Sequence, residues 1–192
     1  GLKCDLEGQE KRSKEALGSL RKGFLFALMF IFLLLASQFK SYFQPVVIMI
    51  AIPFGFVGAI AGHFIMGMPL SLFSIFGIVA LSGIVVNDSL ILIDFINRRA
   101  RSGMEISNAV IKSGSSRFRP VILTSITTIA GLFPLLIERS LQAQFLVPMA
   151  VSITFGLFFA SMLTLLYVPA LYMIVNDITK LFMKRMSKTK NS

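Results

Sequence analysis

GFLFALMFIFLLLAS, residues 23–37, is the stretch that decides the fold, because it holds no charged residue and consists almost entirely of large apolar side chains. Extended back to Leu20 and on to Phe39, the run has about the 20 residues that a helix needs to cross a hydrocarbon core roughly 30 Å thick. We therefore predict a membrane-spanning helix over residues 20–39.

Four more apolar runs follow, and they predict spans over about 45–66, 70–95, 120–137 and 145–175. The runs are too long for the strands of a membrane barrel and do not alternate apolar with polar residues. Since lipid offers the backbone no hydrogen-bonding partner, long apolar runs of this kind must be helical. The sequence predicts an all-α membrane protein, a bundle of about five transmembrane helices.

Overall composition agrees with a membrane location. Hydrophobic residues make up 55% of the 192 residues and the mean hydropathy is +0.80, above the ~45–50% apolar content of soluble domains. The net charge is +10, but the basic residues stand at the ends of apolar runs, where they orient helices. We therefore interpret the charge as a membrane feature and do not predict nucleic-acid binding.

Proline and glycine positions predict details of the helix packing. Pro53 lies inside the second expected span, where it removes a backbone hydrogen bond and predicts a kink. Gly58 and Gly62 form a small-xxx-small pair that allows another helix to approach closely. In the third span, small contact positions are expected at Gly77, Ala80 and Gly83.

Polar segments divide the chain further. Residues 1–22 are charged, and because the sequence begins with Gly rather than Met, we interpret them as an extracytoplasmic segment that ends a missing upstream domain. Residues 23–176 form the expected transmembrane domain. Residues 97–119 are expected to be a basic linker with a short surface helix over residues 104–111, and residues 177–192 a basic tail.

The distribution of charge predicts the orientation. With five spans, one side of the membrane carries twelve Lys and Arg residues, in the Lys40 loop, the linker and the tail, and the other side carries seven. Cytoplasmic loops are enriched in Lys and Arg. We therefore expect the C-terminus in the cytoplasm and the N-terminal segment outside.

Asp88 is the most informative polar residue of the predicted spans. It lies about seven residues, or roughly 10 Å, inside the third span, and an acid at that depth is costly. One interpretation is a proton-carrying group, whose pKa would be raised by desolvation. The other is a structural hydrogen-bonding group between helices. For Asp94, near the end of the span, pairing with a nearby Arg is the favoured interpretation.

Helical periodicity places polar residues on two neighbouring faces. On the third span, the helical repeat of about 3.6 residues per turn places four residues on one face: Gly83, Asn87, Ile91 and Asp94. On the fourth span, the same repeat places Arg117, Thr124, Thr128 and Gly131 on one face. Because the two spans are antiparallel, Thr124 and Thr128 should reach the depth of Asn87 and Asp88. The hydroxyls of Ser125 and Thr127 are expected to bond back to their own helix.

Other chemistry is not predicted. Cys4 is the single cysteine and His63 the single histidine, so no metal site or cofactor is expected. His63 is interpreted as a packed group near the outer end of its span. Motifs for phosphate binding, nucleophilic catalysis or zinc hydrolysis are missing from the sequence, so we do not expect an enzyme.

Several separated motifs resemble one family of transporters. They occur in this order: Phe39–Ser41 with Pro45, Ile52–Gly55 and Gly58–Ile60; Ser71–Phe73 with Gly77–Asp88; Arg117–Ser125 with Gly131, Leu132, Pro134 and Leu135; Val168, Pro169, Leu171 and Tyr172. The sequence resembles the resistance-nodulation-division (RND) efflux permeases of the multidrug type over residues 15–178. The match covers their transmembrane helices 8–12.

The resemblance implies a function and partners. Family members are trimers in the inner membrane of Gram-negative bacteria that export amphiphilic, drug-like substrates in exchange for protons, together with a periplasmic adaptor and an outer-membrane channel. The key proton-binding aspartates lie in the first half of the twelve-helix domain, which this chain lacks. Arg117 and Thr124 match relay residues of the family, whereas Asn87 stands where a relay lysine is usual and is followed by Asp88.

The expected proton relay therefore consists of Asp88, Asn87, Thr124 and Arg117, with Asp94 and Thr128 as further candidates. Two alternatives remain at this point. The chain could belong to an accessory membrane subunit of a protein- or lipid-export machine of the same superfamily, or it could be an inactive truncated fragment. The sequence upstream of Gly1 would separate them, because a pump needs large porter domains there.

Overall fold

The computed structural model is entirely helical in the part that it describes, residues 2–140 and 142–190, with side chains for residues 14–140 and 142–176. The elements are α1 (Leu2–Phe39), α2 (Phe43–Met49), α3 (Ala51–Met66), α4 (Leu72–Arg101), α5 (Ile106–Ile137), the 3-10 turn η1 (Ala143–Phe145) and α6 (Val147–Lys190). Five helical stretches are long and apolar enough to span a membrane: Lys14–Phe39, Phe43–Met66, Leu72–Arg101, Ile106–Ile137 and Val147–Asn176. The predicted fold class is confirmed.

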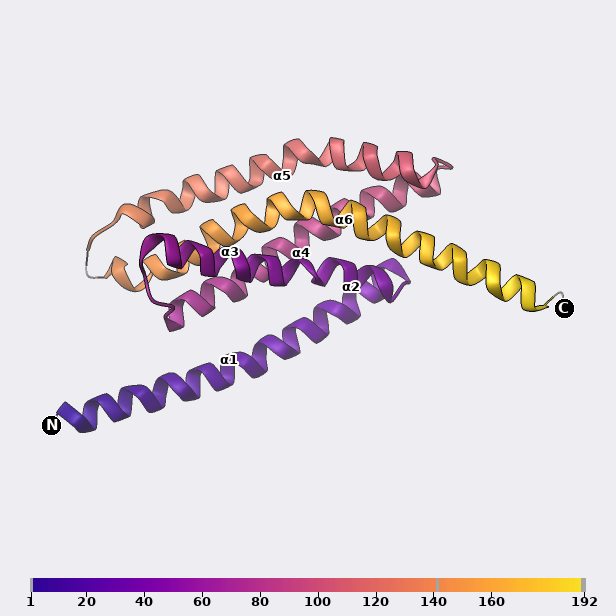
Figure 1. Ribbon diagram of the computed structural model, residues 1–192. Helices are drawn as coiled ribbons and strands as arrows, with labels where there is room; N and C mark the ends of the chain where they lie inside the picture. The colour runs from indigo at the N-terminus through magenta and orange to yellow at the C-terminus, as the bar shows by residue number, and fades with distance from the viewer. Residues whose placement is uncertain (1, 141, 191–192) are drawn as a thin grey trace.

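The five stretches run up and down, so that the connections gather at two ends of the bundle (Figure 1). We call the end that carries Lys40 and the α4–α5 turn the basic end. The opposite end carries the α3–α4 turn and the α5–α6 connection. The N-terminal half of α1 and the C-terminal part of α6 project beyond the bundle (Figure 1).

Helices α3, α4 and α6 form the tightly packed centre. A Cβ added to Gly58 would lie 2.6 Å from Cβ of Phe159 on α6, and one added to Gly77 would lie 2.6 Å from the carbonyl oxygen of Met149. The predicted close approach at these glycines is therefore confirmed, with α6 as the partner of both α3 and α4. Gly83 differs from expectation, because nothing lies within 4 Å of its added Cβ.

Apolar side chains fill the space toward the basic end. The cluster there draws on all six α-helices, and its most deeply buried members are Ile48, Ile93, Ile96, Val168 and Leu92. In contrast, only 6% of the most apolar 18-residue stretch of the first span and 11% of that stretch of α5 are buried within the described residues. Two of the five spans therefore present most of their surface outward.

The second span is divided in two. Helix α2 ends at Met49 and α3 begins at Ala51, so the break lies at Ile50, three residues before Pro53. Pro53 has no N–H to bond the carbonyl of Met49, four residues earlier, and its ring crowds that turn. The kink expected from Pro53 is present, displaced by about one turn toward the basic end.

The basic linker expected over residues 97–119 is mostly helix. Helix α4 continues to Arg101 and α5 begins at Ile106, which leaves a turn of four residues that includes Gly103 with φ of +86°. Three arginines in the last turn of α4 favour its extension, because cations stabilise the negative end of the helix dipole. The separate surface helix expected over residues 104–111 is instead the first part of α5.

Pro120, expected just before the fourth span, and Pro169, expected to interrupt the fifth span, both lie inside continuous helices. Pro120 lies within α5 and Pro169 within α6. Pro120 and Ser116, whose carbonyl loses its partner, are both exposed, so the freed carbonyl can be solvated without breaking the helix. Helices α5 and α6 therefore each continue through their proline without a break.

His63 joins three helices at the opposite end. Its ring is 2% exposed; Nδ1 donates to the carbonyl of Ala59, and Nε2 lies 2.7 Å from the hydroxyl of Ser74. Ser74 also closes the capping box of α4 with Ser71, and its carbonyl accepts a hydrogen bond from Ser152 on α6. His63 is thus a packed group, as predicted.

Candidate functional site

Asp88 lies in the middle of α4 and is half-buried. Among the described side chains it forms no hydrogen bond and no ion pair. An acid inside a spanning helix normally pairs with another group or faces a polar interior. The structure therefore presents one carboxyl group whose partner is not within residues 14–140 and 142–176.

The register of α4 and α5 is fixed at the basic end. The guanidinium carbon of Arg117 lies 3.6 Å from the centroid of the Phe95 ring, and Arg99 donates to the hydroxyl of Ser116 over 2.8 Å. Both contacts join the end of α4 to the start of α5. The two helices run antiparallel from this junction (Figure 1).

This register brings Asp88 and Thr124 to the same level. Asp88 lies seven residues before Phe95, two helical turns away on the same face of α4. Thr124 lies seven residues after Arg117, two turns along α5 in the same direction. Both positions are about 10 Å from the Arg117–Phe95 contact at 1.5 Å per residue.

Arg117 is held within the junction. Its ring partner covers one side of the guanidinium, and its Nε atom is buried without a hydrogen-bonding partner. Nη1 of Arg99 is in the same state. Each of these two guanidinium groups has one buried nitrogen without a hydrogen-bond acceptor. Together they provide a positive potential at the basic end of α4 and α5.

The remaining relay candidates lie on a surface that the described residues leave uncovered. Asn87 and Thr124 are exposed, and Thr128 is half-buried. The hydroxyl of Thr124 donates to the carbonyl of Val121 in its own helix over 2.9 Å, so only its oxygen lone pairs remain available. Gly83 and Gly131 on the same faces are also exposed, which leaves room for a helix to approach.

Asp94 is accounted for by an ion pair. Its Oδ2 lies 2.8 Å from Nε of Arg98, one turn later on α4, and the two side chains are 29% and 75% exposed. The pairing with a nearby arginine predicted for Asp94 is confirmed. Such exposed pairs contribute little to stability, and this contact gives Asp94 no link to Asp88.

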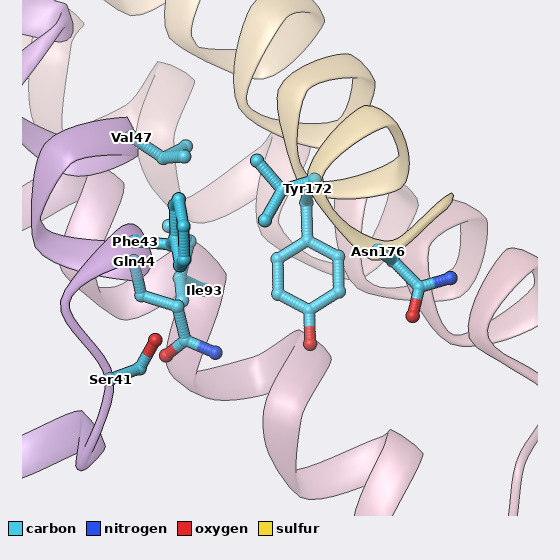
Figure 2. A pocket seen from close by; sticks show the side chains of 8 residues that line it. Ser41, Phe43, Gln44, Val47, Ile93, Tyr172 and Asn176 are labelled. Carbon is cyan, nitrogen blue, oxygen red and sulfur yellow. The ribbon is translucent and has the colours of Figure 1, made fainter. Parts of the chain in front are cut away.

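A polar cluster that the sequence analysis missed lies at the basic end. The carboxamides of Gln44 and Asn97 exchange two hydrogen bonds, of 3.1 and 3.0 Å, and the Tyr172 hydroxyl donates to Oδ1 of Asn97 over 2.8 Å. Gln44 and Tyr172 border a cavity of about 250 Å³ together with Ser41 and Asn176 (Figure 2). The cluster ties α2, α4 and α6 together.

One signal in the sequence could have indicated this cluster. Asn97 is spaced eight residues from Ser89 and four from Ile93, and all three lie on the buried face of α4. A carboxamide on an apolar helix face needs partners when it is buried. Gln44 and Tyr172 are far from it in sequence, so the partners themselves could not be named.

Buried hydroxyl groups form a second polar region between the helices. Ser125 on α5 and Ser161 on α6 are 2.8 Å apart, so Ser125 does not simply bond back to its own helix as expected. Thr127 does, to the carbonyls of Leu123 and Thr124. Within the described residues, no three His, Cys, Asp or Glu side chains are grouped in a way that could hold a metal ion.

Comparison with known proteins identifies the family. The family model described as AcrB/AcrD/AcrF matches residues 1–176. The chain belongs to the AcrB/AcrD/AcrF family. The family comprises RND efflux transporters, which are not enzymes, so the resemblance in the separated motifs is confirmed.

Relatives of this AcrB/AcrD/AcrF chain come from different bacteria. It is 30% identical over 180 residues to the swarming motility protein SwrC of Bacillus subtilis, and 28% identical over 169 residues to the multidrug resistance protein MdtC of Proteus mirabilis. These matches cover 93% and 88% of the chain but only 17% and 16% of the two relatives. The chain thus spans about one sixth of their length.

Solved structures of one relative have the same fold. Two crystal forms of a heavy metal efflux pump superpose with TM-scores of 0.78 and 0.76 at 29% identity. Each superposition covers 88% of this chain and 16% of the pump. The arrangement of α1–α6 is therefore that of one part of a larger family member, and the chain is a multi-pass membrane protein.

Proposed function

We propose that this chain supplies the second-half proton-relay helices of a proton-driven efflux pump. The observation that carries the proposal is Asp88, a half-buried acid that forms no hydrogen bond or ion pair with the described side chains and lies at about the depth of Thr124 on α5. The insertion cost of such an acid, ~2.5–3.5 kcal/mol at mid-membrane, favours its retention for a task. Taking up and releasing a proton is a task that requires a carboxyl group there.

Each residue of the relay has a distinct role in this proposal. Asp88 exchanges the proton with the aspartates of the family's first-half helices, and Asn87 provides a neutral hydrogen-bonding group beside it. Thr124 accepts a hydrogen bond through the lone pairs that its bond to Val121 leaves free. Arg117, fixed on Phe95, stabilises negative charge at the basic end. Thr128 and Asp94 remain further candidates for the relay.

The uncovered face supports a role within a larger protein. Four residues of this face are exposed: Asn87, Thr124, Gly83 and Gly131. In lipid, the polar side chains among them need hydrogen-bonding partners. A helix from the other half of the transmembrane domain, packed on this face, would supply them. By family likeness, the whole pump is a homotrimer that takes amphiphilic, drug-like substrates and works with an adaptor and an outer channel.

The proposed location is a bacterial inner membrane, with the basic end and the C-terminus in the cytoplasm. The charge bias of twelve Lys and Arg residues against seven supports this orientation. A Gram-negative host fits the adaptor and outer channel, although the family extends to Bacillus subtilis, which is Gram-positive. Cysteine labelling of residue 103 from each side of the membrane tests the orientation.

Efflux assays in the complete transporter test the relay. We expect Asp88→Asn, which keeps size but removes the charge, to abolish drug resistance at unchanged expression. Asp94→Asn serves as the matched control, because its carboxylate is already paired with Arg98, and should retain most of the activity. Normal efflux in Asp88→Asn and Thr124→Ala together would show that the proposed relay is wrong.

A control is also available for Thr124. Thr127 lies on the same helix, is equally exposed and bonds back to its own carbonyls. Thr127→Ala should therefore leave efflux unchanged, whereas Thr124→Ala should lower it. Equal losses of efflux in the two variants would mean that both hydroxyls only stabilise the helix, and that Thr124 has no role in proton transfer.

A further inference from the structure

A groove runs between α5 and α6 on the basic half of the bundle. It has a volume of about 530 Å³ and is lined by Gly114, Ser115, Phe118, Ile122, Met162 and Leu166 among others. On the α5 side, Ser115, Phe118 and Ile122 follow the spacing of one helix face. Phe118 and Leu166 are 58% and 71% exposed, so the groove opens outward.

The groove is shaped by a missing side chain. Nothing lies within 4 Å of a Cβ added to Gly114, so the glycine leaves open space next to Ser115. From Gly114 to Ile122 the groove extends about 12 Å along α5 at 1.5 Å per residue. Its walls are apolar except for the Ser115 hydroxyl, which suits a hydrocarbon chain.

Two cations stand beside this apolar groove. Lys112 lies three residues before Ser115 and Arg119 four residues after it, so both flank the same side of α5. Both are exposed. Neither the ammonium of Lys112 nor the guanidinium of Arg119 has a hydrogen bond or ion pair with the described side chains.

Neighbouring arginines are already engaged, which sets Lys112 and Arg119 apart. Arg98 pairs with Asp94, Arg99 bonds Ser116, and Arg117 stacks on Phe95. Only one acid, Glu105, lies within residues 98–119, and it bonds to the side chain of Asn108. The positive charge beside the groove is therefore uncompensated by the described part of the chain.

The length of α5 places these cations at the membrane surface. Its 32 residues extend about 48 Å at 1.5 Å per residue, which exceeds a hydrocarbon core of roughly 30 Å. The first turns of α5 therefore lie at headgroup depth on the basic side. From there, long Lys and Arg side chains reach the interface while the groove beside them continues into the hydrocarbon.

We propose that the α5–α6 groove binds an anionic phospholipid. One acyl chain lies along Phe118, Ile122 and Leu166, and the phosphate is held between Lys112 and Arg119. Basic pockets between transmembrane helices bind acidic headgroups in this way. The apolar groove fits the acyl chain of the lipid, and the uncompensated positive charge fits its headgroup. A single class of ligand therefore matches both features.

Lipid titration of the complete transporter, purified in neutral detergent and observed by native mass spectrometry, tests the site. The probes are phosphatidylglycerol and phosphatidylcholine with identical acyl chains. We expect tighter binding of phosphatidylglycerol, weakened about 5-fold by Lys112→Gln or Arg119→Gln and about 30-fold by both, from ~1 kcal/mol for each charge. Unchanged binding in the double variant would overturn the proposal.

Two further variants separate the headgroup from the groove. Arg101→Gln removes an exposed cation from the end of α4, away from the groove, and should leave binding unchanged. Gly114→Leu places an apolar side chain in the groove and should weaken the binding of both lipids; nothing lies within 4 Å of a Cβ added at Gly114. A loss in Arg101→Gln equal to that in the double variant, or undiminished binding in Gly114→Leu, contradicts the site.

Glycerol phosphate distinguishes a lipid from a free anion. It presents a phosphate group without an acyl chain, so we expect no displacement of phosphatidylglycerol at equal concentration. Displacement by equimolar glycerol phosphate would mean that Lys112 and Arg119 form a simple phosphate site, and the proposal of a lipid site would be wrong. Circular dichroism of each variant checks that the helices remain intact.

Discussion

The guanidinium of Arg117 on α5 lies over the Phe95 ring on α4, 3.6 Å from its centroid. This contact fixes the register of two helices whose polar faces carry Asp88 and Thr124. A flat guanidinium on an aromatic face also keeps its charge while losing only part of its hydration. The same pair thus aligns the helices and positions a charge at one end of the candidate relay.

Replacing Phe95 by Leu tests the importance of this contact. The substitution keeps an apolar side chain of similar reach but removes the ring, so we expect a loss of about 0.5–2 kcal/mol in the free energy of unfolding. Efflux should fall as well, because Arg117 loses its fixed position. Unfolding in mixed micelles and drug-resistance assays measure the two effects.

The control for Phe95 is Phe133, an exposed ring on α5 on which no cation stacks among the described side chains. Phe133→Leu should change neither stability nor efflux to a comparable extent. Equal effects of the two substitutions would indicate that the Phe95 ring contributes only apolar surface, with no specific interaction with Arg117.

Gly77 provides a test of the packing between α4 and α6. In Gly77→Ala, the added Cβ would lie 2.6 Å from the Met149 carbonyl oxygen and 2.9 Å from Cβ of Ser152, so one helix must shift. Overpacking of this kind costs typically ~1–3 kcal/mol. Thermal unfolding of the variant should show this loss, because backbone atoms cannot move aside as a flexible side chain does.

Gly23→Ala is the matched substitution, since nothing lies within 4 Å of a Cβ at Gly23 in α1. Alanine is favoured over glycine inside a helix by roughly 0.5–1 kcal/mol. We therefore expect this variant to be as stable as the parent or more so. A stable Gly77→Ala variant would show that the close approach of α4 and α6 is not required.

Glu138 gives a prediction of pH dependence in the α5–α6 connection. The backbone N–H groups of Ser140 and Arg139 each donate to its Oε1 over 3.0 Å. These bonds favour the carboxylate and hold the pKa of Glu138 below its usual value of 4.5. The stabilisation is therefore complete above pH 4.5 and is lost as the pH falls through the lowered pKa.

Carbon NMR of the labelled carboxyl group measures this pKa. The midpoint should lie below 4.5 in the parent chain. In Ser140→Pro, which removes the N–H that lowers the pKa most, the midpoint should rise toward the usual value. A midpoint that stays in place after this substitution would show that the Ser140 bond does not form in the membrane.

Helices were predictable from the sequence wherever apolar length decided the structure. A run such as residues 23–37 has one solution in lipid, so all five spans and the contact glycines Gly58 and Gly77 followed from the sequence. The ends did not, because continuation of α4 to Arg101 and of α5 through Pro120 depends on solvation outside the hydrocarbon. Hydropathy contains no information on that boundary.

Candidate site residues could be selected from the sequence, but most of their contacts could not be predicted from it. The spacing of Asp88 from Asp94 indicated which acid lies deep and which pairs at the helix end, and the Asp94–Arg98 pair agrees. The stacking of Arg117 on Phe95 and the Ser125–Ser161 contact needed the rotation of each helix about its axis. That rotation is set by packing against residues distant in sequence.

The cluster of Gln44, Asn97 and Tyr172 gives the last prediction. Tyr172→Phe removes the hydroxyl that donates to Asn97 but leaves the two bonds between the carboxamides. We expect a loss of about 0.5–1.5 kcal/mol, as for one hydrogen bond. Asn97→Leu should cost more, because the amide of Gln44 and the hydroxyl of Tyr172 both lose their partner in a half-buried site.

A double-mutant cycle separates these contributions. The variant with both Tyr172→Phe and Asn97→Leu should lose less free energy of unfolding than the sum of the two single losses. The reason is that Tyr172→Phe then removes a hydroxyl that has already lost its acceptor. The expected coupling is at least about 0.5 kcal/mol in the free energy of unfolding. Strict additivity would mean that the 2.8 Å contact between Tyr172 and Asn97 contributes nothing to the free energy of unfolding.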